Sequence, residues 1–594
     1  MQKHPDVTKG RIRQFMEFQL QETIFHDARP VKGDLLIQAC ANSDEAAKAK
    51  EWTPVEPGTA WGPTYQEGWY RLKLNLPEGW KGKQAVLLNG NLQVLRWTEW
   101  PNLDVMCEGT VWLNNRQVGG LDHGHPYVRL SDDHPGEVFI QLFARNRETT
   151  VHRPEQPRTP KPEKVPDFHV ALLDEEKLAL FYDCEHAFNL AEAHDEKDPL
   201  VATIIRALND ICNTYEADKP KTWSKCRKIL KDALGSLNTE YKHTLYPVGH
   251  AHLDTAWLWP LSVTHLKMFH TTAIQLDLID RYPEHVFAHS QASQYEWLEK
   301  EQPELFARVK AAIKKGQWEV VGSMWVEADC NLTGAESLVR QFLYGRRYFQ
   351  QKLGVETVDM WLPDVFGYSA ALPQILNRFQ IKAFLTQKMS WNQFNKIPHN
   401  TFFWKGIDGS SIWTHFPPVD TYIASGAPKE MIDGVKRHRD QGRSDASLYL
   451  YGFGDGGGGP TEWHIERLRR ARTSPGLPFV ESKIKAKQFF TEVREQSHDL
   501  MTWAGELYFE YHRGTYTSQA ANKRFNRLTE FLLRDAEWLS CFRKDFDKAY
   551  PAERLEAAWK LILLNQFHDI IPGSSVREVY EDSDRDYAQI IEEG

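Results

Sequence analysis

The chain has 594 residues, enough for about four domains at roughly 150 residues per domain. Its hydrophobic content of 41% and charged content of 26% are typical of a soluble globular protein, and no apolar run reaches the roughly 18 residues that cross a bilayer. The formal net charge of -9 is weak and mixed along the chain, and the first residues carry no apolar secretion signal, so we expect a cytoplasmic protein that binds neither nucleic acid nor membranes.

The first part of the chain predicts a helix followed by a β domain. Apolar residues recur at helical spacing over 10–26, and we assign residues 1–55 to an N-terminal helical arm. Short alternating runs such as WYRLKLNL and EVFIQLF, separated by Gly, Asn, Asp and Pro, predict a β-sandwich domain over 56–180. Within it, the Pro-rich stretch RNRETTVHRPEQPRTPKPEKVPDFHV is typical of a stiff extended crossing segment rather than a core element. Helical patterns then predict a helical linker region over 181–240.

Residues 241–500 predict a catalytic α/β domain. Short apolar strand candidates (TLYPVGH, HVFAHS, WEVVGS, VDMWLPD, IKAFLTQ and SLYLYGF) alternate with amphipathic helical stretches. Such alternation indicates parallel strands with crossover helices, either as a β/α barrel or as a layered sheet. Residues 501–594 are predicted to be a helical bundle, so the fold class is multidomain α/β.

The densest polar cluster, GHAHLDTAW, follows the first of these strands. In extended backbone, residues two apart share a face, so His250, His252 and Asp254 can point toward one spot. Imidazole nitrogen and carboxylate oxygen without sulfur form the ligand set of catalytic zinc. The seven cysteines are scattered and form no CxxC pair, which fits a reducing compartment and excludes a thiolate zinc finger. The alternative is that these side chains cap helices or satisfy the core.

Further carboxylates follow other strands of this domain. Glu327 and Asp329 follow WEVVGSMWV, Asp364 follows the strand MWL, and Asp455 follows SLYLYGF and precedes a glycine run. The glycine run lacks the Lys and Ser/Thr of a phosphate-binding loop. Each Asp alone is more typical of a cap or a turn, but the carboxyl ends of strands converge in α/β folds, which favours a shared site.

A last cluster, NQFHDIIPGSS, carries His568 and Asp569 at the end of the final predicted amphipathic helix. A histidine near the C-terminal end of a helix also complements the helix dipole, and this cluster alone favours that structural role.

Taken in order, these five clusters resemble the motif series of glycoside hydrolase family 38, the retaining α-mannosidases, and most closely its cytosolic-type and bacterial branch. The motifs are GHAHLDTAWLWP, GSMWVEADCNLTG, WLPDVFGYSAALPQIL, GDGGGGPT and NQFHDIIPGSS, and the similarity runs from about residue 10 to the end. The resemblance implies an N-terminal β domain, a seven-stranded β/α barrel-like catalytic domain and a helical bundle. It also implies a mannose-containing oligosaccharide as substrate and leaves a homo-oligomer possible.

The resemblance assigns roles to individual residues. One zinc ion, with cobalt as an alternative, is expected on four ligands: His252, Asp254, Asp329 and His568. Asp329 is also the expected nucleophile, and the remaining substrate-binding residues are Trp257 as a sugar-stacking floor, Asp364 and Asp569. Asp455 is the expected general acid, with Asp364 as the alternative, because the related branches carry two acidic residues where this chain has only Gly454-Asp455-Gly456.

Two other functions remain open at the level of sequence. One is a different zinc-dependent carbohydrate hydrolase, such as a deacetylase in which zinc activates water; the other is a metal-assisted mannose-binding protein without catalysis. The chain also departs from the related branches in WNQFNKIPHN, where Asn395 and Lys396 replace acidic and aromatic residues, so the linkage preference is not predicted. The C-terminal β domains usual in the family are missing at Gly594, which suggests a short form or a truncated chain.

Overall fold

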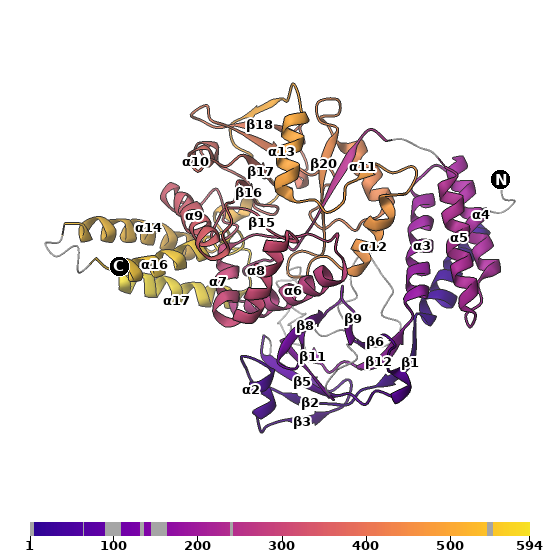
Figure 1. Ribbon diagram of the computed structural model, residues 1–594. Helices are drawn as coiled ribbons and strands as arrows, with labels where there is room; N and C mark the ends of the chain where they lie inside the picture. The colour runs from indigo at the N-terminus through magenta and orange to yellow at the C-terminus, as the bar shows by residue number, and fades with distance from the viewer. Residues whose placement is uncertain are drawn as a thin grey trace.

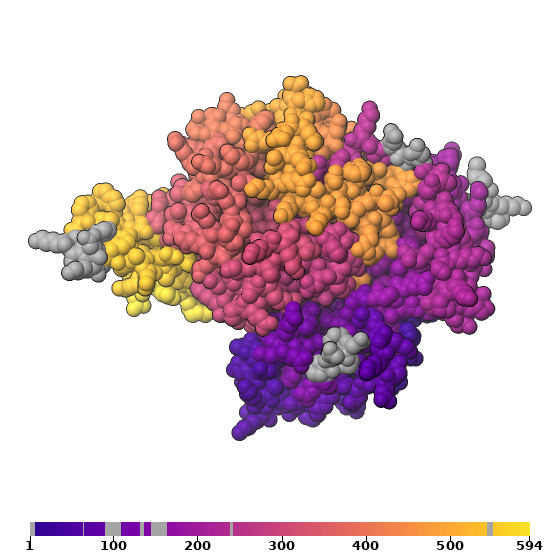
Figure 2. Space-filling model, viewed as in Figure 1, coloured from indigo at the N-terminus to yellow at the C-terminus, as the bar shows by residue number. Residues whose placement is uncertain are grey.

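The computed structural model describes residues 5–62, 65–89, 108–130, 136–143, 163–237, 241–542 and 550–594. Figure 1 shows a β domain, a group of helices beside it, a central α/β unit and a C-terminal helical bundle. In the space-filling view of Figure 2, the β domain and the bundle are lobes on the central unit. Among the helices of the described ranges, none combines the length and apolarity needed to span a bilayer.

The β domain is a sandwich of two antiparallel sheets, as predicted. Residues of β6 and β12 alternate between two cores: Leu87 and Leu172 face the other sheet, whereas Val86 and Ala171 face the neighbouring helices. Because both faces are covered at β6 and β12, these two strands carry continuous apolar runs rather than alternating ones. The sheets have the orders β1 (Phe25–Pro30), β12 (His169–Leu173), β6 (Ala85–Leu88), β9 (Tyr127–Leu130) and β3 (Thr53–Val55), β2 (Gly33–Leu36), β5 (Glu67–Lys73), β10 (Glu137–Phe143), β7 (Gly109–Leu113), β8 (Arg116–Leu121).

Two predictions for this region are wrong in part. The helical arm does not reach residue 55: helix α1 (Pro5–Gln14) continues as short helical turns to Thr23, and β1, β2 and β3 follow. The strand β1 has the sequence FHDARP and is mostly exposed, so no apolar alternation marked it as a strand. Most of the Pro-rich segment lies outside the described residues, but its last residues enter β12, a central strand of its sheet.

The predicted helical linker is a packed unit of three helices that begins earlier, at residue 175. The helices α3 (Glu175–Glu192), α4 (Pro199–Thr214) and α5 (Pro220–Gly235) contact one another, and α3 and α4 also contact α1. Asp174 and Asp198 cap α3 and α4 by accepting hydrogen bonds from backbone N–H groups. Such side chains satisfy the otherwise unpaired donors of a helix start, which fixes where these helices begin.

The six predicted strands of the central unit are all present, but they belong to two sheets. One sheet has the order β15 (Trp318–Val320), β14 (Phe287–His289), β13 (Thr244–His250), β20 (Ala446–Tyr451), with β21 (Phe479–Val480) also pairing with β13. The other has the order β16 (Asp359–Trp361), β17 (Ala383–Leu385), β19 (Ser411–His415), β18 (Thr401–Lys405), β22 (Thr502–Ala504). No strand pairing joins the two sheets within the described ranges, so closure into a seven-stranded barrel stays a prediction.

The sequence analysis missed the antiparallel hairpin of β18 and β19. Its turn carries Asp408-Gly409, a dipeptide typical of tight hairpins, and Gly409 has a φ of +87°. Strand β22 pairs with β18 and therefore extends the central unit past the predicted boundary at residue 500.

The C-terminal bundle consists of α14 (Ala520–Ser540), α16 (Ala552–Asn565) and α17 (Arg577–Glu593), which contact one another (Figure 1). It joins the central unit through α9 (Ala335–Tyr348), where Arg340 pairs with Glu537 and lies over the ring of Trp559. The bundle is thus packed on the central unit, and this packing places the segment that follows α16 next to the ends of the central strands.

Candidate metal and catalytic site

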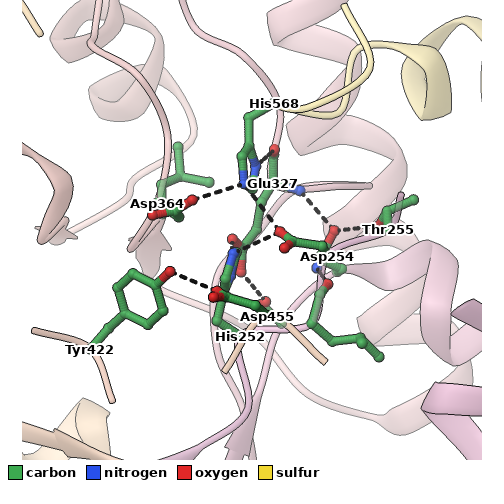
Figure 3. A network of polar contacts seen from close by, with 12 residues as sticks. His252, Asp254, Thr255, Glu327, Asp364, Tyr422, Asp455 and His568 are labelled. Carbon is green, nitrogen blue, oxygen red and sulfur yellow. Dashed lines mark hydrogen bonds and ion pairs between the residues drawn. The ribbon is translucent and has the colours of Figure 1, made fainter. Parts of the chain in front are cut away.

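Three of the predicted metal ligands meet in one buried place. His252 and Asp254 follow β13, and His568 follows α16 (Figure 3). Their ligand atoms all lie within 4.8 Å of one another. The carboxylate oxygen Oδ1 of Asp254 is 3.0 Å from Nε2 of His252 and 3.5 Å from Nε2 of His568.

Within the described part of the chain, the atoms that face one another in this group have no hydrogen-bond partner. These atoms are Nε2 of His252, Oδ1 of Asp254 and Nε2 of His568, and the three residues are only 0–2% exposed. A buried polar atom left unpaired costs about 1–3 kcal/mol, so three such atoms around one point need a common partner. A divalent cation fits, because the donors are two imidazole nitrogens and a carboxylate oxygen.

Glu327 contacts both histidines of the group. Its backbone oxygen accepts a hydrogen bond from Nδ1 of His568 at 2.7 Å, which leaves Nε2 of that ring facing Asp254. Its carboxylate oxygen Oε2 lies 2.9 Å from Nδ1 of His252, and Ser290 donates to Oε1 at 2.6 Å. A carboxylate behind a ligating histidine fixes the orientation of the ring. The sequence analysis named Glu327 but gave it no role. Its position two residues before Asp329 was a signal that the two side chains could lie on the same face of an extended segment.

A short backbone pairing brings His568 to the site. Ala328 and Phe567 form an antiparallel bridge, in which Asp329 N donates to Gln566 O at 2.9 Å and His568 N donates to Glu327 O at 3.3 Å. The prediction that His568 ends the last helix is therefore wrong. Helix α16 ends at Asn565, and another helix follows the site, so His568 lies in paired backbone rather than at a helix end.

Asp329 is not part of the group of facing ligand atoms. Its Oδ1 accepts hydrogen bonds from the backbone N–H groups of Asn331 at 2.9 Å and Leu332 at 2.6 Å. Burial raises the pKa of Asp329, although these two N–H groups oppose the shift. The structure thus places three of the four predicted ligands together, and ligation by Asp329 stays a prediction.

Asp455 and Asp364 lie next to the group formed by His252, Asp254 and His568 (Figure 3). The hydroxyl of Tyr422 donates to Oδ1 of Asp455 at 2.7 Å, and burial together with the carboxylates of Asp254 and Asp364 raises the pKa of Asp455 to about 6. Asp364 pairs with Lys388 at 2.6 Å, and its other oxygen lies 3.8 Å from Nε2 of His568. Two carboxyl groups in different electrostatic surroundings are typical of sites that carry out acid and base chemistry.

The remaining predicted residues differ in their surroundings. Asp569 is buried and accepts a hydrogen bond from Ser574, and burial with the nearby Asp254 carboxylate raises its pKa to about 7. Trp257 is half-buried and its ring packs edge-on against Trp259, so its role as a sugar-stacking floor stays a prediction. His250 faces away from the group, because its Nε2 donates to the backbone oxygen of Tyr422 at 2.6 Å.

Comparison with known families covers most of the chain. Residues 242–506 match the family model described as "Glycosyl hydrolases family 38 N-terminal domain". Residues 510–594 match "Alpha mannosidase middle domain", and residues 37–194 match "Alpha-mannosidase, jelly roll domain". The last match agrees with the sandwich seen in the β domain.

Several curated relatives align with nearly the whole chain. Alpha-mannosidase G of Dictyostelium discoideum is 34% identical over 100% of this chain and 55% of its own length. Alpha-mannosidase 2C1 of Homo sapiens is 36% identical over 93% of this chain and 53% of its own length. The chain thus spans about half the length of these relatives. Among solved structures, an alpha-mannosidase from Enterococcus faecalis V583 matches 59% of this chain and 41% of its own, with a TM-score of 0.53 and 23% identity, which supports the fold.

We predict that His568→Ala abolishes stoichiometric binding of a divalent metal, because it removes one of three converging ligands. The measurement is metal content by mass spectrometry after gel filtration of protein loaded with zinc. The matched control is His265→Ala, since His265 stacks on Trp297 and pairs with Glu301 outside the group. Full metal content in His568→Ala would show that the group is not the metal site.

We predict that Glu327→Gln weakens metal binding by about 10- to 100-fold without abolishing it, because the amide no longer holds His252 as a carboxylate does. Competition with a chromophoric chelator measures the affinity. Glu319→Gln is the control, since Glu319 is also buried but accepts hydrogen bonds from Ala486 N and Lys487 N. Equal affinities of Glu327→Gln and wild type would contradict the orienting role.

Proposed function

Because the chain belongs to glycoside hydrolase family 38, we propose that it is a zinc-dependent retaining α-mannosidase that hydrolyses terminal α-mannosyl residues of oligosaccharides. One observation carries the proposal: His252, Asp254 and His568 present unpaired, buried ligand atoms to one point that carboxyl groups surround. A structural zinc site would have four closed ligands, usually with sulfur, whereas this group has nitrogen and oxygen donors only. Zinc bound there would supply orientation and charge stabilisation for the sugar hydroxyls.

Asp329 is proposed as the nucleophile and, when metal is bound, as a further ligand. In the first step an oxygen of its carboxylate bonds to the anomeric carbon while the bond from that carbon to the leaving oxygen breaks. In the second step water attacks the same carbon and the bond to Asp329 breaks. Two successive displacements return the α configuration. The attacking carboxylate must also be held in one orientation. The N–H groups of Asn331 and Leu332 do this by donating to Oδ1 of Asp329.

Asp455 is proposed as the group that donates a proton to the leaving oxygen and later takes one from the attacking water. Its pKa of about 6 keeps a share of this carboxyl group protonated near neutral pH. Asp364 is less suited, because Lys388 pairs with it at 2.6 Å, whereas no cation pairs with Asp455 within the described ranges. We assign Asp364 and Asp569 to binding of sugar hydroxyls and Trp257 to stacking against the ring.

We predict that the first product released from an α-mannoside keeps the α configuration. NMR spectra recorded before mutarotation measure the anomer directly. A fluorinated mannosyl trap should in parallel label the peptide that carries Asp329, and it should label nothing in Asp329→Ala. A β-anomer would mean inversion with water as the direct nucleophile, and an unlabelled wild-type protein would favour a hydrolase of another type.

We predict that Asp455→Ala lowers cleavage of mannobiose by about 10²- to 10⁴-fold, the usual contribution of a general acid. The rate of cleavage of an activated aryl mannoside should fall far less, because its leaving group departs without a proton. Added azide should partly restore turnover of the aryl substrate, which steady-state assays can measure. If Asp364→Ala shows this dependence on the leaving group and Asp455→Ala does not, Asp364 is the proton donor.

A further inference from the structure

The loop that carries Asp455 has a positive φ at four positions, of which only Asp455 is not a glycine. Asp455 itself has a φ of 57°, and the glycines Gly456, Gly458 and Gly459 have φ values of 120°, 87° and 81°. A residue other than glycine is disfavoured in the left-handed region and persists there where the surroundings fix it. Inside the loop, Phe453 and Gly459 exchange two backbone hydrogen bonds of 2.9 Å. The loop is therefore closed on itself, and its remaining carbonyl groups need donors from elsewhere.

Helix α6 (Leu261–Arg281) supplies donors from one side. Gln275 Nε2 donates to the carbonyl oxygens of Gly458 and Pro460, both at 2.8 Å. Lys267 Nζ donates to the carbonyl oxygen of Gly456 at 3.2 Å. Both side chains are almost fully buried, so water does not compete for these carbonyls.

The β domain holds the loop from the other side. In the turn between β8 and β9, His125 has Nε2 at 3.0 Å from Pro460 O and Nδ1 at 2.9 Å from an Asp122 oxygen. The second Asp122 oxygen lies 2.7 Å from Nε2 of His270 on α6. Because both nitrogens of His125 face acceptors, the ring donates on each side when protonated, and the Asp122 carboxylate outweighs burial and raises the pKa of His125.

A second charged pair links the same elements. Glu108, which precedes β7, pairs with Lys267 at 2.5 Å, and both residues are buried. The β domain therefore supplies the counter-charge for the lysine that donates to the loop. Removing one partner of such a pair leaves an uncompensated buried charge.

Two glycines allow the β domain to approach the Asp455 loop and helix α6 closely. A Cβ on Gly458 would lie 2.7 Å from Oδ2 of Asp122, and a Cβ on Gly120 of β8 would lie 2.4 Å from Cε1 of His270. The first distance shows that the turn of the β domain lies directly on the glycine run. The glycine run, which the sequence analysis could not assign to a phosphate site, thus has a packing role at the boundary between two domains.

We infer that Asp122 and His125 of the β domain, together with Lys267 and Gln275 of α6, form a clamp that positions Asp455 for proton transfer. The inference rests on the proposed role of Asp455 as proton donor. These four are positioning residues, since they act on the backbone that carries the carboxyl group. The β domain then takes part in positioning the proton donor.

The test compares Gln275→Leu and His125→Asn with the control Gln117→Leu. Gln117 lies on the same boundary between β domain and central unit, but it donates to Gln302 at 2.6 Å rather than to the loop. For the two clamp variants, kcat/KM on mannobiose should fall about tenfold more than kcat/KM on an activated aryl mannoside, because a misplaced acid matters only when the leaving group needs a proton. In the control variant Gln117→Leu, any change in kcat/KM should be the same for both substrates. Equal losses in the clamp variants would overturn the inference.

A second readout does not depend on activity. Gly457 N and Gly459 N are hydrogen-bonded within the loop, so hydrogen exchange of the peptide around 453–460 should be faster in both clamp variants and unchanged in Gln117→Leu. Unchanged exchange in the clamp variants would overturn the clamp. A zinc-loaded wild type that cleaves neither substrate would refute the proposed function, and exchange would still decide whether the loop is held. If Gln275→Leu does not fold, Asp122→Asn replaces it with the same expected outcomes.

Discussion

The bridge between residues 327–329 and 566–568 is the contact on which the site depends. It pairs the segment between β15 and α9 with the segment after α16, so one short stretch of backbone aligns Glu327, Asp329 and His568 at once. The Glu327 carbonyl group fixes the ring of His568 through the same pairing, and the Glu327 carboxylate lies behind His252. Because the bundle packs on α9, the bridge is supported by tertiary contacts as well as by two backbone hydrogen bonds.

This arrangement concentrates negative charge in a place that water reaches poorly. Asp254, Asp329, Asp364 and Asp569 are each at most 7% exposed, and Asp455 lies beside them. Buried carboxyl groups near one another cannot all ionise without compensation, which raises the pKa values of Asp455 and Asp569 to about 6 and about 7. Lys388 compensates Asp364, and a cation held by the unpaired ligand atoms of Asp254 and its neighbours would compensate the rest.

Local patterns were enough to predict six strands of the central unit and the polar clusters that follow strands, but not their mutual arrangement. The six predicted strands exist because each is a short apolar run between turn residues, and the residues that follow them converge as expected for an α/β fold. Strand β1 was missed because it is mostly exposed. The place of His568 could not be derived from helical periodicity, since a β-bridge with residues about 240 positions earlier fixes it. The role of Glu327 likewise depends on a ring that the chain brings close only in three dimensions.

The central unit also depends on contacts with the C-terminal bundle and the β domain to complete the candidate site. The family model for this unit ends at residue 506, whereas the segment that supplies His568 lies beyond it and the turn that holds the Gly458 region lies before it. One residue of the candidate metal group therefore comes from the segment that follows α16, and donors to the loop of Asp455 come partly from the β domain. Strained backbone and unpaired ligand atoms both raise the free energy of the site, and both are held by neighbours that belong to other domains. Residues of three domains thus meet at the candidate site, and the buried polar contacts of Asp122, Lys267 and Glu327 lie at the boundaries between them.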